Sequence, residues 1–463
     1  MKNNLGVIGL ATMGANLAQN LADHNFRVAI YNRTGARTEE LIKTYGKDRG
    51  LVPFYNLKDF IASLEKPRVV LLMVQAGAGT DAVLEEVCGL LQKGDIVIDG
   101  GNSFFKDTIR REAAAREKGL NFVGMGVSGG EEGARRGPAI MPGGSLAAWE
   151  KIKPIFSQIA AKDFKNDCCI NLIGANGAGH FVKMVHNAIE YVDMQLIAEI
   201  YWMMKLGLRL KNEQMAEIFA KWNKDKLNSY LIEITGKILK TKDKKGKYVL
   251  DYILDSAGNK GTGKWTSLES LDLGVPSFSI SAAVFARYIS AFKKERIKIS
   301  GYYKKNWIKT RLSAKQLEKA LYAAKILAYA QGYELIYLAS KKYNWNINLK
   351  ELSRIWQGGC IIRAKFLDNL YRIFKETPNL ENILLSKYFR AEISKNIKDL
   401  REVAAQAIKN SLPAPAILSC LTYFDSIASK NLPANLLQAQ RDFFGAHTFQ
   451  KKVDGEFFHY QWE

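Results

Sequence analysis

Hydrophobic and polar positions follow two different patterns along the chain. Between Leu5 and about Gly174, short apolar runs of strand length are separated by amphipathic segments with helical spacing. This alternation is typical of βαβ units. We therefore expect a Rossmann-like α/β domain, a doubly wound and mainly parallel sheet with helices on both faces. The predicted strands are LGVIG, RVAIY, RVVLLMV, DIVID, FVGMGV, AIMPGG and CCINLIG.

The second pattern is helical almost throughout, from residue 177 to about residue 429. Two segments rich in Gly and Lys, 235–248 and 256–266, interrupt it as predicted loops. The chain then ends in a strongly aromatic segment, which we expect to pack on its own domain or on a partner subunit. The predicted organisation is a Rossmann-like domain at 1–176, a large all-helical domain at 177–432 and a C-terminal tail at 433–463.

Composition narrows the class of protein. The chain has 463 residues, of which 47% are hydrophobic, enough to bury a large core. No run approaches the roughly 18 to 20 uninterrupted apolar residues of a membrane span, and no cleavage-site pattern follows the first residues. The five cysteines are scattered and lack the paired spacing of a metal or redox motif. These features predict a cytoplasmic globular protein with free thiols, no membrane partner and no metal site.

The formal net charge of +21 has two interpretations. A basic surface attracts acidic partners such as nucleic acid, a membrane surface or a phosphorylated metabolite. Alternatively, the lysines form an ordinary solvated surface, which we favour because the densest run, KILKTKDKKGK at 237–247, has the composition of an exposed turn. No helix-turn-helix, zinc-finger or aromatic RNA-binding motif accompanies it, so we expect no nucleic-acid partner.

A glycine turn follows the first predicted strand and opens the first predicted helix. Its residues are Gly9, Leu10, Ala11, Thr12, Met13 and Gly14. Gly9 permits the tight turn, the small side chain of Ala11 lets the backbone approach a pyrophosphate, and Gly14 lets the helix pack closely on the strand. Ala11 replaces the usual second glycine. The strand, turn and helix N-terminus together predict a dinucleotide site.

The end of the second predicted strand indicates which dinucleotide is bound. Enzymes that use NAD place Asp or Glu there to bind the ribose hydroxyls. This chain has Asn32, Arg33 and Thr34, a cation flanked by hydrogen-bonding groups. A 2′-phosphate fits this set, so NADP is favoured. The alternative is that Arg33 is only a solvated turn residue.

Four polar residues share one face of a predicted helix that begins near Gly177. Lys183, His186, Asn187 and Glu190 fall at i, i+3, i+4 and i+7 among otherwise apolar residues. A polar stripe of this kind is costly unless it is exposed or lines a site. In a dry pocket, desolvation brings a lysine toward neutrality and keeps a glutamic acid protonated. The helix is therefore predicted to hold a base that serves alcohol oxidation and an acid that protonates a carbanion or enediol. A surface helix with a Lys–Glu ion pair is the alternative.

Three further segments are predicted to recognise anions and hydroxyls. The residues 100–103 (GGNS) and 128–130 (SGG) follow predicted strands, where ligands bind to open parallel sheets. The loop 260–264 (KGTGK) resembles a small phosphate cradle, to which Arg287 adds a fork of donors. It lacks the spacing of a P-loop, so an ATPase is not indicated. Taken alone, each of the first two segments is equally compatible with an ordinary Gly-rich turn.

With these residues in place, the chain resembles the 6-phosphogluconate dehydrogenase family along nearly its whole length. The matching motifs are GLATMG, NRT, IDGGNS, GVSGGEEGARRGP, GAGHFVKMVHNAIEY, AGNKGTGKWT, WQGGCIIR and AQRDFFGAHTF, in this order. The early motifs are shared with other β-hydroxyacid dehydrogenases, whereas HFVKMVHNAIEY, NKGTGKWT and RDFFGAHTF are more specific. The resemblance implies oxidation of 6-phosphogluconate by NADP in the pentose phosphate pathway, with release of CO2 and formation of ribulose 5-phosphate.

The same resemblance implies roles for individual residues. Lys183 is implied as the base that takes the proton of the 3-hydroxyl, and Glu190 as the acid that protonates the enediol. The sugar acid is implied to bind to Asn102, Ser128, Gly129, Gly130, His186 and Asn187, and its phosphate to Tyr191, Lys260, Thr262 and Arg287. The cofactor is implied to contact the glycine turn and the NRT strand end, and also Val74, Gln75, Ala76 and Asn102.

The resemblance also implies a homodimer in which Arg441 and His447 of the tail reach the neighbouring subunit's site. One departure from many relatives is Gln75, which stands where they have a lysine. Two other functions remain open from the sequence. A β-hydroxyacid dehydrogenase for an unphosphorylated substrate has no use for a phosphate cradle, and a catalytically silent dinucleotide-binding protein does not need Lys183 and Glu190.

Overall fold

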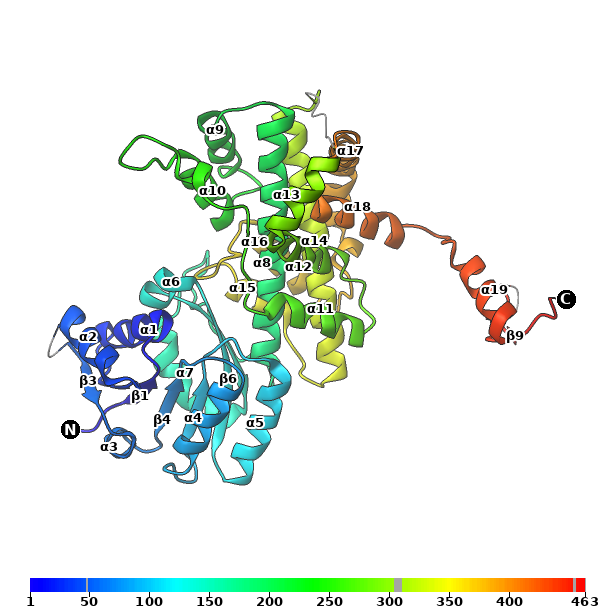
Figure 1. Cartoon of the computed structure of the whole chain (residues 1–463). Helices are drawn as coiled ribbons and strands as arrows, with labels where there is room; N and C mark the ends of the chain where they lie inside the picture. Colours follow the sequence, from blue (N-terminus) through cyan, green and yellow to red (C-terminus); the bar gives the residue numbers. More distant parts are fainter. Residues whose placement is uncertain (47–48, 304–309, 453–454, 463) are drawn as a thin grey trace.

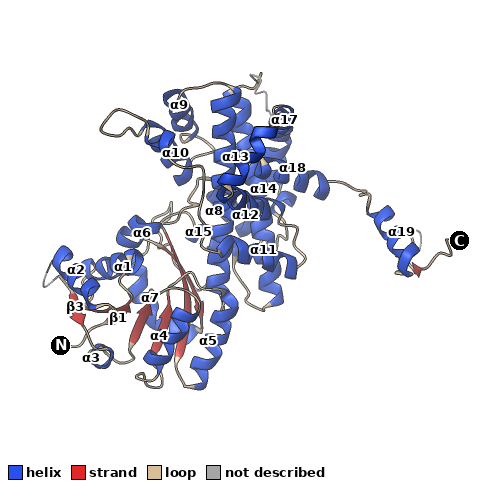
Figure 2. Cartoon of the chain, in the orientation of Figure 1, coloured by secondary structure: helices blue, strands red, loops and turns tan. Residues whose placement is uncertain are grey.

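The computed structural model describes residues 1–46, 49–303, 310–452 and 455–462. An N-terminal α/β domain and a helical domain are joined through one long helix, α8 (Ala178–Trp202), which runs from the sheet into the helical domain (Figure 1). Figure 2 shows all the strands of the larger sheet gathered in the N-terminal domain and almost only helices beyond it. The predicted fold class, a Rossmann-like sheet followed by a large helical domain, is confirmed.

The sheet has seven strands in the order β3-β2-β1-β4-β5-β6-β7. The strands β1 to β6 pair in parallel, whereas β7 pairs antiparallel with β6. Neighbouring residues of β1 enter opposite cores, with Val7 on one face and Ile8 on the other, as the two-residue period of a strand requires. The strand bounds are β1 Leu5–Ile8, β2 Val28–Tyr31, β3 Leu51–Phe54, β4 Val69–Leu72, β5 Ile96–Asp99, β6 Asn121–Ser128 and β7 Ala139–Gly144.

Seven helices cover the sheet on both faces (Figure 1). One core packs β1 against α1 and α7, and the other packs it against α3 and α4. The helix bounds are α1 Thr12–Asp23, α2 Gly35–Tyr45, α3 Leu57–Ala62, α4 Ala78–Cys88, α5 Phe105–Glu117, α6 Gly130–Arg136 and α7 Leu146–Ile159.

Two strand predictions were wrong. The strand β3 was missed because its sequence is only LVPF and contains a proline, which strands tolerate mainly at a sheet edge. The segment CCINLIG is not a strand and meets β7 only at isolated bridges, such as that of Ile170 with Ile140. The side chain of Arg354 donates to the carbonyl oxygens of Cys168 and Ile170, so these groups are not available for a strand ladder.

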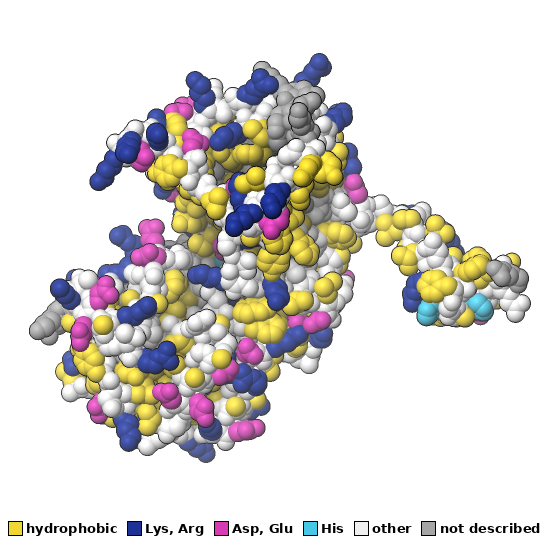
Figure 3. Space-filling model, viewed as in Figure 1, with side chains coloured by type: hydrophobic (Ala, Val, Ile, Leu, Met, Phe, Trp, Pro, Cys, Tyr) yellow, Lys and Arg dark blue, Asp and Glu magenta, His cyan; other side chains and the backbone are white. Residues whose placement is uncertain are grey.

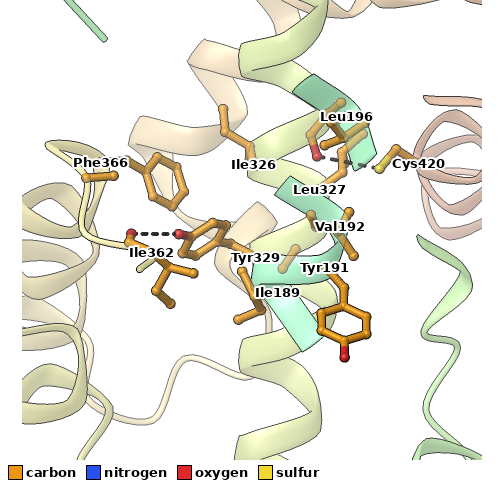
Figure 4. Close-up of a cluster of buried hydrophobic side chains, with 14 of the residues drawn as sticks. Ile189, Tyr191, Val192, Leu196, Ile326, Leu327, Tyr329, Ile362, Phe366 and Cys420 are labelled. Atoms are coloured by element: carbon orange, nitrogen blue, oxygen red, sulfur yellow. Dashed lines mark hydrogen bonds between the residues drawn. The ribbon is translucent and has the colours of Figure 1, made fainter. Parts of the chain in front are cut away.

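The helical domain is built around α8 and α14 (Ala314–Lys342), which pack against each other along the centre. Figure 4 shows Ile189, Val192 and Leu196 of α8 against Ile326 and Leu327 of α14. The remaining elements are η1 Met203–Gly207, α9 Asn212–Trp222, α10 Tyr230–Lys240, η2 Val249–Tyr252, α11 Thr262–Asp272, α12 Phe278–Ala291, α13 Lys293–Tyr302, α15 Leu349–Ile355, α16 Phe366–Glu376, η3 Ile383–Leu385, α17 Lys387–Lys409 and α18 Pro415–Ile427.

Both predicted loops of this domain are shorter than expected. The helix α10 continues to Lys240, because Leu239 is still buried and Gly236 lies where α9 passes close by. The helix α11 begins at Thr262, directly after Gly261, whose φ of +92° suits glycine. Turn-forming residues inside a helix therefore extended the loop predictions too far.

The tail forms a small unit of its own. It consists of α19 (Ala434–Gly445), β8 (Phe449–Gln450) and β9 (Phe457–Phe458), with the two strands paired antiparallel. Figure 1 shows this unit standing away from the helical domain. Several of its large apolar side chains are exposed, namely Leu436, Leu437, Phe443, Phe444, Phe457, Phe458, Tyr460 and Trp462. In the single chain the tail therefore does not pack on its own domain.

Lysine and arginine side chains are scattered over the face shown in Figure 3, and hydrophobic side chains gather on the tail and on the side of the helical domain. All five cysteines are unpaired thiols. In the described part of the chain, no group of three or more His, Cys, Asp or Glu side chains could hold a metal ion. None of the helices there combines the length and apolar character needed to cross a bilayer.

Candidate active site

The polar stripe on α8 is positioned by a close approach of that helix to the sheet. A Cβ atom added at Gly126 of β6 would lie 2.5 Å from the Cβ atom of Lys183. Gly179, in the first turn of α8, would clash in the same way with the carbonyl oxygens of Gly124 and Met141. The glycines in β6 and α8 therefore let the helix cross directly over the carboxyl end of the sheet, which places Lys183 at its edge.

Lys183 is buried, and none of the described carboxylates forms an ion pair with it. Its side chain is 6% exposed, and its Nζ donates to Oδ1 of Asn187 at 2.6 Å. Burial lowers the pKa of the Lys183 ammonium, an effect that Glu190 and the Cys360 thiol oppose only in part. An amine with a lowered pKa can accept a proton near neutral pH.

Glu190 lies two turns further along the same helix. Burial raises the pKa of its carboxyl group, while Lys183 and Arg287 lower it and Asp193 raises it. The net shift is upward, so the carboxyl tends to keep its proton. On this face of α8, Lys183 and His186 are buried, Asn187 and Glu190 are half-buried, and no ion pair joins Lys183 to Glu190 among the described residues, so the surface-helix alternative is wrong.

His186 is held between the sheet and its own helix. Its Nε2 lies 3.2 Å from Oγ of Ser128, and its Nδ1 lies 3.1 Å from Oδ1 of Asn187. Burial lowers the pKa of the imidazole well below its usual value, and the Lys183 charge lowers it further. The ring is therefore neutral. Since the Asn187 oxygen can only accept, the proton is assigned to Nδ1, and Nε2 accepts from Ser128.

The predicted phosphate cradle lies beside the end of the polar stripe. The guanidinium of Arg287 stacks on the ring of Tyr191, 3.3 Å from its centroid, and donates to the carbonyl oxygen of Gly258 at 3.1 Å. The backbone N–H of Lys260 lies 3.4 Å from the Tyr191 hydroxyl. Thr262 Oγ1 lies 3.4 Å from Nδ2 of Asn187, which connects the loop to α8. Figure 4 shows the Tyr191 hydroxyl directed away from the hydrophobic cluster of α8 and α14.

The loops after β4 and β5 are tied together by an arginine that was not predicted. The Arg111 side chain, almost fully buried in α5, donates to Asp99 at 3.2 Å and to Ser103 at 3.3 Å. It also donates to Asp81 at 2.8 Å and to the carbonyl oxygen of Gly77 at 3.0 Å. The exposed Asn102 and the cofactor-loop residues Val74, Gln75 and Ala76 flank these anchored positions. No local motif marks Arg111, because its partners come from distant segments.

The glycine turn has the geometry of a dinucleotide cradle. Gly9 has φ of +95°, and a Cβ atom at Gly14 would collide with the Gly9 carbonyl oxygen. Asn32 Oδ1 accepts from the Leu10 N–H at 3.0 Å, which joins the turn to the end of β2. Gly9 and Gly14 thus play the conformational roles expected of them.

The end of β2 is exposed and cationic. Arg33 and Thr34 are exposed, and Arg37, in the first turn of α2, borders a cavity of about 380 Å³ that Leu10, Ala11 and Thr12 also line. Arg37 was missed, although its place only three residues after Thr34, in the first turn of the next helix, is the signal that could have found it. An anionic group beside the glycine turn has two cations available.

Two predicted site residues lie elsewhere in the single chain. Arg441 and His447 are exposed on the tail, which Figure 1 shows away from α8. The structure therefore brings together Lys183, His186, Asn187, Glu190, Tyr191, Ser128, Thr262 and Arg287, and it leaves the two tail residues outside this group.

A Rossmann-like sheet packed against a helix that carries a buried lysine and a half-buried glutamic acid defines a dinucleotide-dependent oxidoreductase. Comparison with known families identifies which one. The model described as the NAD binding domain of 6-phosphogluconate dehydrogenase matches residues 4–174, and the 6-phosphogluconate dehydrogenase C-terminal domain matches residues 179–462. The chain belongs to the 6-phosphogluconate dehydrogenase family.

Individual relatives agree over the full length. The chain is 50% identical to the decarboxylating 6-phosphogluconate dehydrogenase of Lactococcus lactis, covering 99% of this chain and 98% of that protein. It is 49% identical to the enzyme of the same name from Escherichia coli K12, covering 100% of this chain and 99% of that protein. The solved Plasmodium falciparum 6-phosphogluconate dehydrogenase superposes with a TM-score of 0.95 at 43% identity, covering 99% of this chain and 100% of that one.

Proposed function

We propose that the chain catalyses the oxidative decarboxylation of 6-phosphogluconate to ribulose 5-phosphate and CO2, with NADP as the oxidant. The observation that carries this proposal is that the buried Lys183, which lies against the sheet, and the half-buried Glu190 stand on one face of one helix. The Plasmodium falciparum relative has been solved with its cofactor NADP+ and with its substrate 6-phosphogluconate. The reaction belongs to the pentose phosphate pathway.

The residues at the nucleotide site fit NADP. The turn from Gly9 to Gly14 supplies backbone N–H groups for the pyrophosphate, and Asn32, Arg33 and Thr34 bind the 2′-phosphate, with Arg37 beside them. Val74, Gln75, Ala76 and Asn102 border the nicotinamide half. When bound, NADP supplies a hydride acceptor beside the substrate. Because Gln75 carries no charge, the preference for NADP over NAD rests on the cations near β2.

Lys183 acts in the first step. Its neutral amine takes the proton of the substrate 3-hydroxyl while the hydride leaves C3, and this forms a 3-keto acid. The resulting ammonium then polarises the keto oxygen, so that the electrons of the breaking C1–C2 bond are accepted as CO2 departs. Asn187 Oδ1, 2.6 Å from Nζ, holds the amine in place through both events.

Glu190 acts in the last step. Loss of CO2 leaves an enediol, and protonation of its former C2 carbon by the Glu190 carboxyl gives ribulose 5-phosphate. Burial favours the protonated form of that carboxyl, because desolvation raises its pKa. Base and acid are therefore separate groups with opposite pKa shifts, the arrangement expected when proton removal and proton delivery occur at different atoms.

The substrate is held along the same face. Asn102, Ser128, Gly129 and Gly130, with His186 and Asn187, bind the carboxylate and hydroxyls. Tyr191, Lys260, Thr262 and Arg287 bind the phosphate, for which Arg287 offers a planar fork of donors. This phosphate site favours a phosphorylated sugar acid over the smaller hydroxy acids of other β-hydroxyacid dehydrogenases.

The site is completed by a second subunit. The tail exposes large apolar side chains and stands away from its own domain (Figure 1), which supports a homodimer in which Arg441 and His447 reach the neighbouring substrate. The domain limits that accompany this proposal are 1–176 for NADP binding, 177–432 for the substrate and dimerisation, and 433–463 for the tail. A cytoplasmic location remains a prediction from the sequence.

An NADP-reduction assay with 6-phosphogluconate tests the function. We expect NADPH and CO2 in equal amounts, and ribulose 5-phosphate as the sugar product. NADPH formation with 3-hydroxyisobutyrate but not with 6-phosphogluconate would assign the chain to another substrate. Absence of NADPH with either acid, in protein that binds NADP, would indicate a silent dinucleotide-binding protein.

A further inference from the structure

The tail is organised around one carboxylate. Asp442, near the end of α19, is fully buried although every residue from Arg441 to His447 other than Asp442 itself is exposed. Its Oδ1 accepts the backbone N–H of Thr448 at 2.8 Å and Nδ1 of His459 at 2.9 Å. Its Oδ2 accepts the backbone N–H of Tyr460 at 3.1 Å and Nε1 of Trp462 at 2.9 Å. A single side chain therefore joins the helix, the turn after it and the last residues of the chain.

The turn that Asp442 closes is strained. Ala446 and Thr448 have φ values of +48° and +58°, and a β-branched residue in the left-handed region is uncommon because its side chain meets the backbone. Such a conformation persists only where its surroundings impose it, and strain of this kind is concentrated at functional sites. The Thr448 N–H is held by Asp442, and its carbonyl oxygen accepts from Nε2 of Gln438 at 2.6 Å.

His447 lies between these two strained residues. Its ring meets the ring of Phe444 edge-on, with the centroids 6.0 Å apart. A Cβ atom at Gly445 would lie 2.7 Å from its Nε2, so a larger residue there would displace the ring. The turn thus fixes the direction of the His447 side chain. Arg441, the other tail residue proposed to reach the substrate, directly precedes Asp442 on α19.

We propose that Asp442 is a positioning residue that holds the tail in the shape in which His447 and Arg441 reach the substrate of the neighbouring subunit. This inference rests on the proposed dimeric function. Its basis is the combination of a buried carboxylate that accepts from four donors and of a residue with positive φ on each side of His447. The tail needs such an internal support because, in the single chain, the body of the protein does not support it (Figure 1).

An ionised carboxylate suits this place better than any neutral group. Burial raises the pKa of Asp442, but the hydrogen bonds from His459, Tyr460, Trp462 and Thr448 lower it to about 2. Each of the two oxygens accepts from two N–H donors. An asparagine of the same shape would point its NH2 group at two of those donors, and the turn would lose half of its support.

The first test is Asp442→Asn in the full-length dimer, with Asp425→Asn as the matched control. Asp425 is an exposed carboxylate paired with Arg401 on the body of the protein, and its loss should leave the kinetics unchanged. For Asp442→Asn we expect an unchanged dimer in sedimentation and about a tenfold or greater fall in kcat/KM for 6-phosphogluconate. The KM for NADP should not change, because the proposal places Arg441 and His447 at the substrate and not at the glycine turn or the end of β2.

A double-mutant cycle separates positioning from general loss of structure. If Asp442 acts through His447, then Asp442→Asn combined with His447→Ala should lose little more than His447→Ala alone. Fully additive losses, or wild-type kinetics of Asp442→Asn, would overturn the inference while leaving the proposed reaction intact.

Heterodimers test whether the tail acts across the interface. A Lys183→Met chain has an inactive site but an intact tail, and an Asp442→Asn chain has the reverse defects. Coexpressed with different tags and purified as the mixed dimer, they should have one fully active site, with the wild-type KM for 6-phosphogluconate. If the mixed dimer instead keeps, per intact Lys183 site, the lowered kcat/KM of the Asp442→Asn homodimer, the tail acts within its own subunit, and delivery to the neighbour is refuted. Failure of the wild-type protein to oxidise 6-phosphogluconate would instead refute the proposed function.

Discussion

Replacement of Lys183 by methionine is the most direct perturbation of the proposed chemistry. Methionine keeps much of the volume of the side chain but cannot accept a proton. Loss of a positioned base costs about 10²- to 10⁴-fold in rate, which corresponds to about 3 to 5 kcal/mol of transition-state stabilisation. We expect the upper end of this range. The site is too buried for bulk water to replace the amine, and both ring nitrogens of His186 are already hydrogen-bonded.

The same substitution should not destabilise the fold. Burial lowers the folded-state pKa of Lys183, so the unfolded chain binds the proton more tightly than the folded one. The lysine therefore costs stability at pH values below its unfolded pKa, and this cost disappears as the pH rises above that value. Lys183→Met removes the cost. We expect its melting temperature at neutral pH to equal or exceed that of the wild type, with the gain vanishing at high pH.

The assay combines three measurements on Lys183→Met and on the control Lys237→Met, whose lysine is exposed on α10. NADPH formation gives kcat and kcat/KM, fluorescence titration gives the Kd for NADP, and calorimetry gives the melting temperature. We expect turnover to fall by at least 10²-fold with an unchanged Kd, because the cofactor contacts lie on other elements. Turnover within tenfold of wild type, in protein that is folded and binds NADP, would refute the assignment of the base.

Three other substitutions test separate parts of the site. Glu190→Gln should lower kcat and remove the fall of kcat/KM at high pH. That fall is expected to follow deprotonation of the Glu190 carboxyl, whose pKa burial has raised. A pH profile of the variant with the same fall at high pH as the wild type would contradict the role of Glu190 as the acid. Arg33→Asp should raise the KM for NADP and lower that for NAD, since a carboxylate repels the 2′-phosphate and accepts ribose hydroxyls, and an unchanged ratio of the two would exclude Arg33 as a determinant. Arg111→Met should lower the free energy of unfolding, measured by chemical denaturation, by about 3 to 5 kcal/mol, because it leaves the buried Asp99 without its cation. It should also raise the KM values for cofactor and substrate together. A loss below about 1 kcal/mol would show that the two loops do not depend on Arg111.

The sequence was most informative where function is encoded in local spacing. The face formed by Lys183, His186, Asn187 and Glu190 follows from helical periodicity alone, and the structure places it in a buried site. The turn from Gly9 to Gly14 was also predictable, because the need for glycine at these two positions arises from close contacts within a short strand–turn–helix unit.

Features that depend on distant partners were not predictable in this way. Arg111 bonds to Asp81, thirty positions away in the chain, and the failure of CCINLIG to form a strand depends on Arg354, far along the sequence. Asp442 carried no local signal either. Its donors lie just before β8 and after β9, and none of them belongs to its own helix. Periodicity reports which face of an element is buried, but it does not report what lies against that face.

The course of α8 has a mechanical consequence. Lys183 and Glu190 are seven residues apart on one continuous helix, about 10.5 Å along its axis at 1.5 Å per residue. Because both groups stand on one continuous helix, their separation is set by that helix and does not depend on how the sheet packs against the helical domain. The group proposed to remove a proton and the group proposed to deliver one are therefore held in fixed register by a single element of secondary structure.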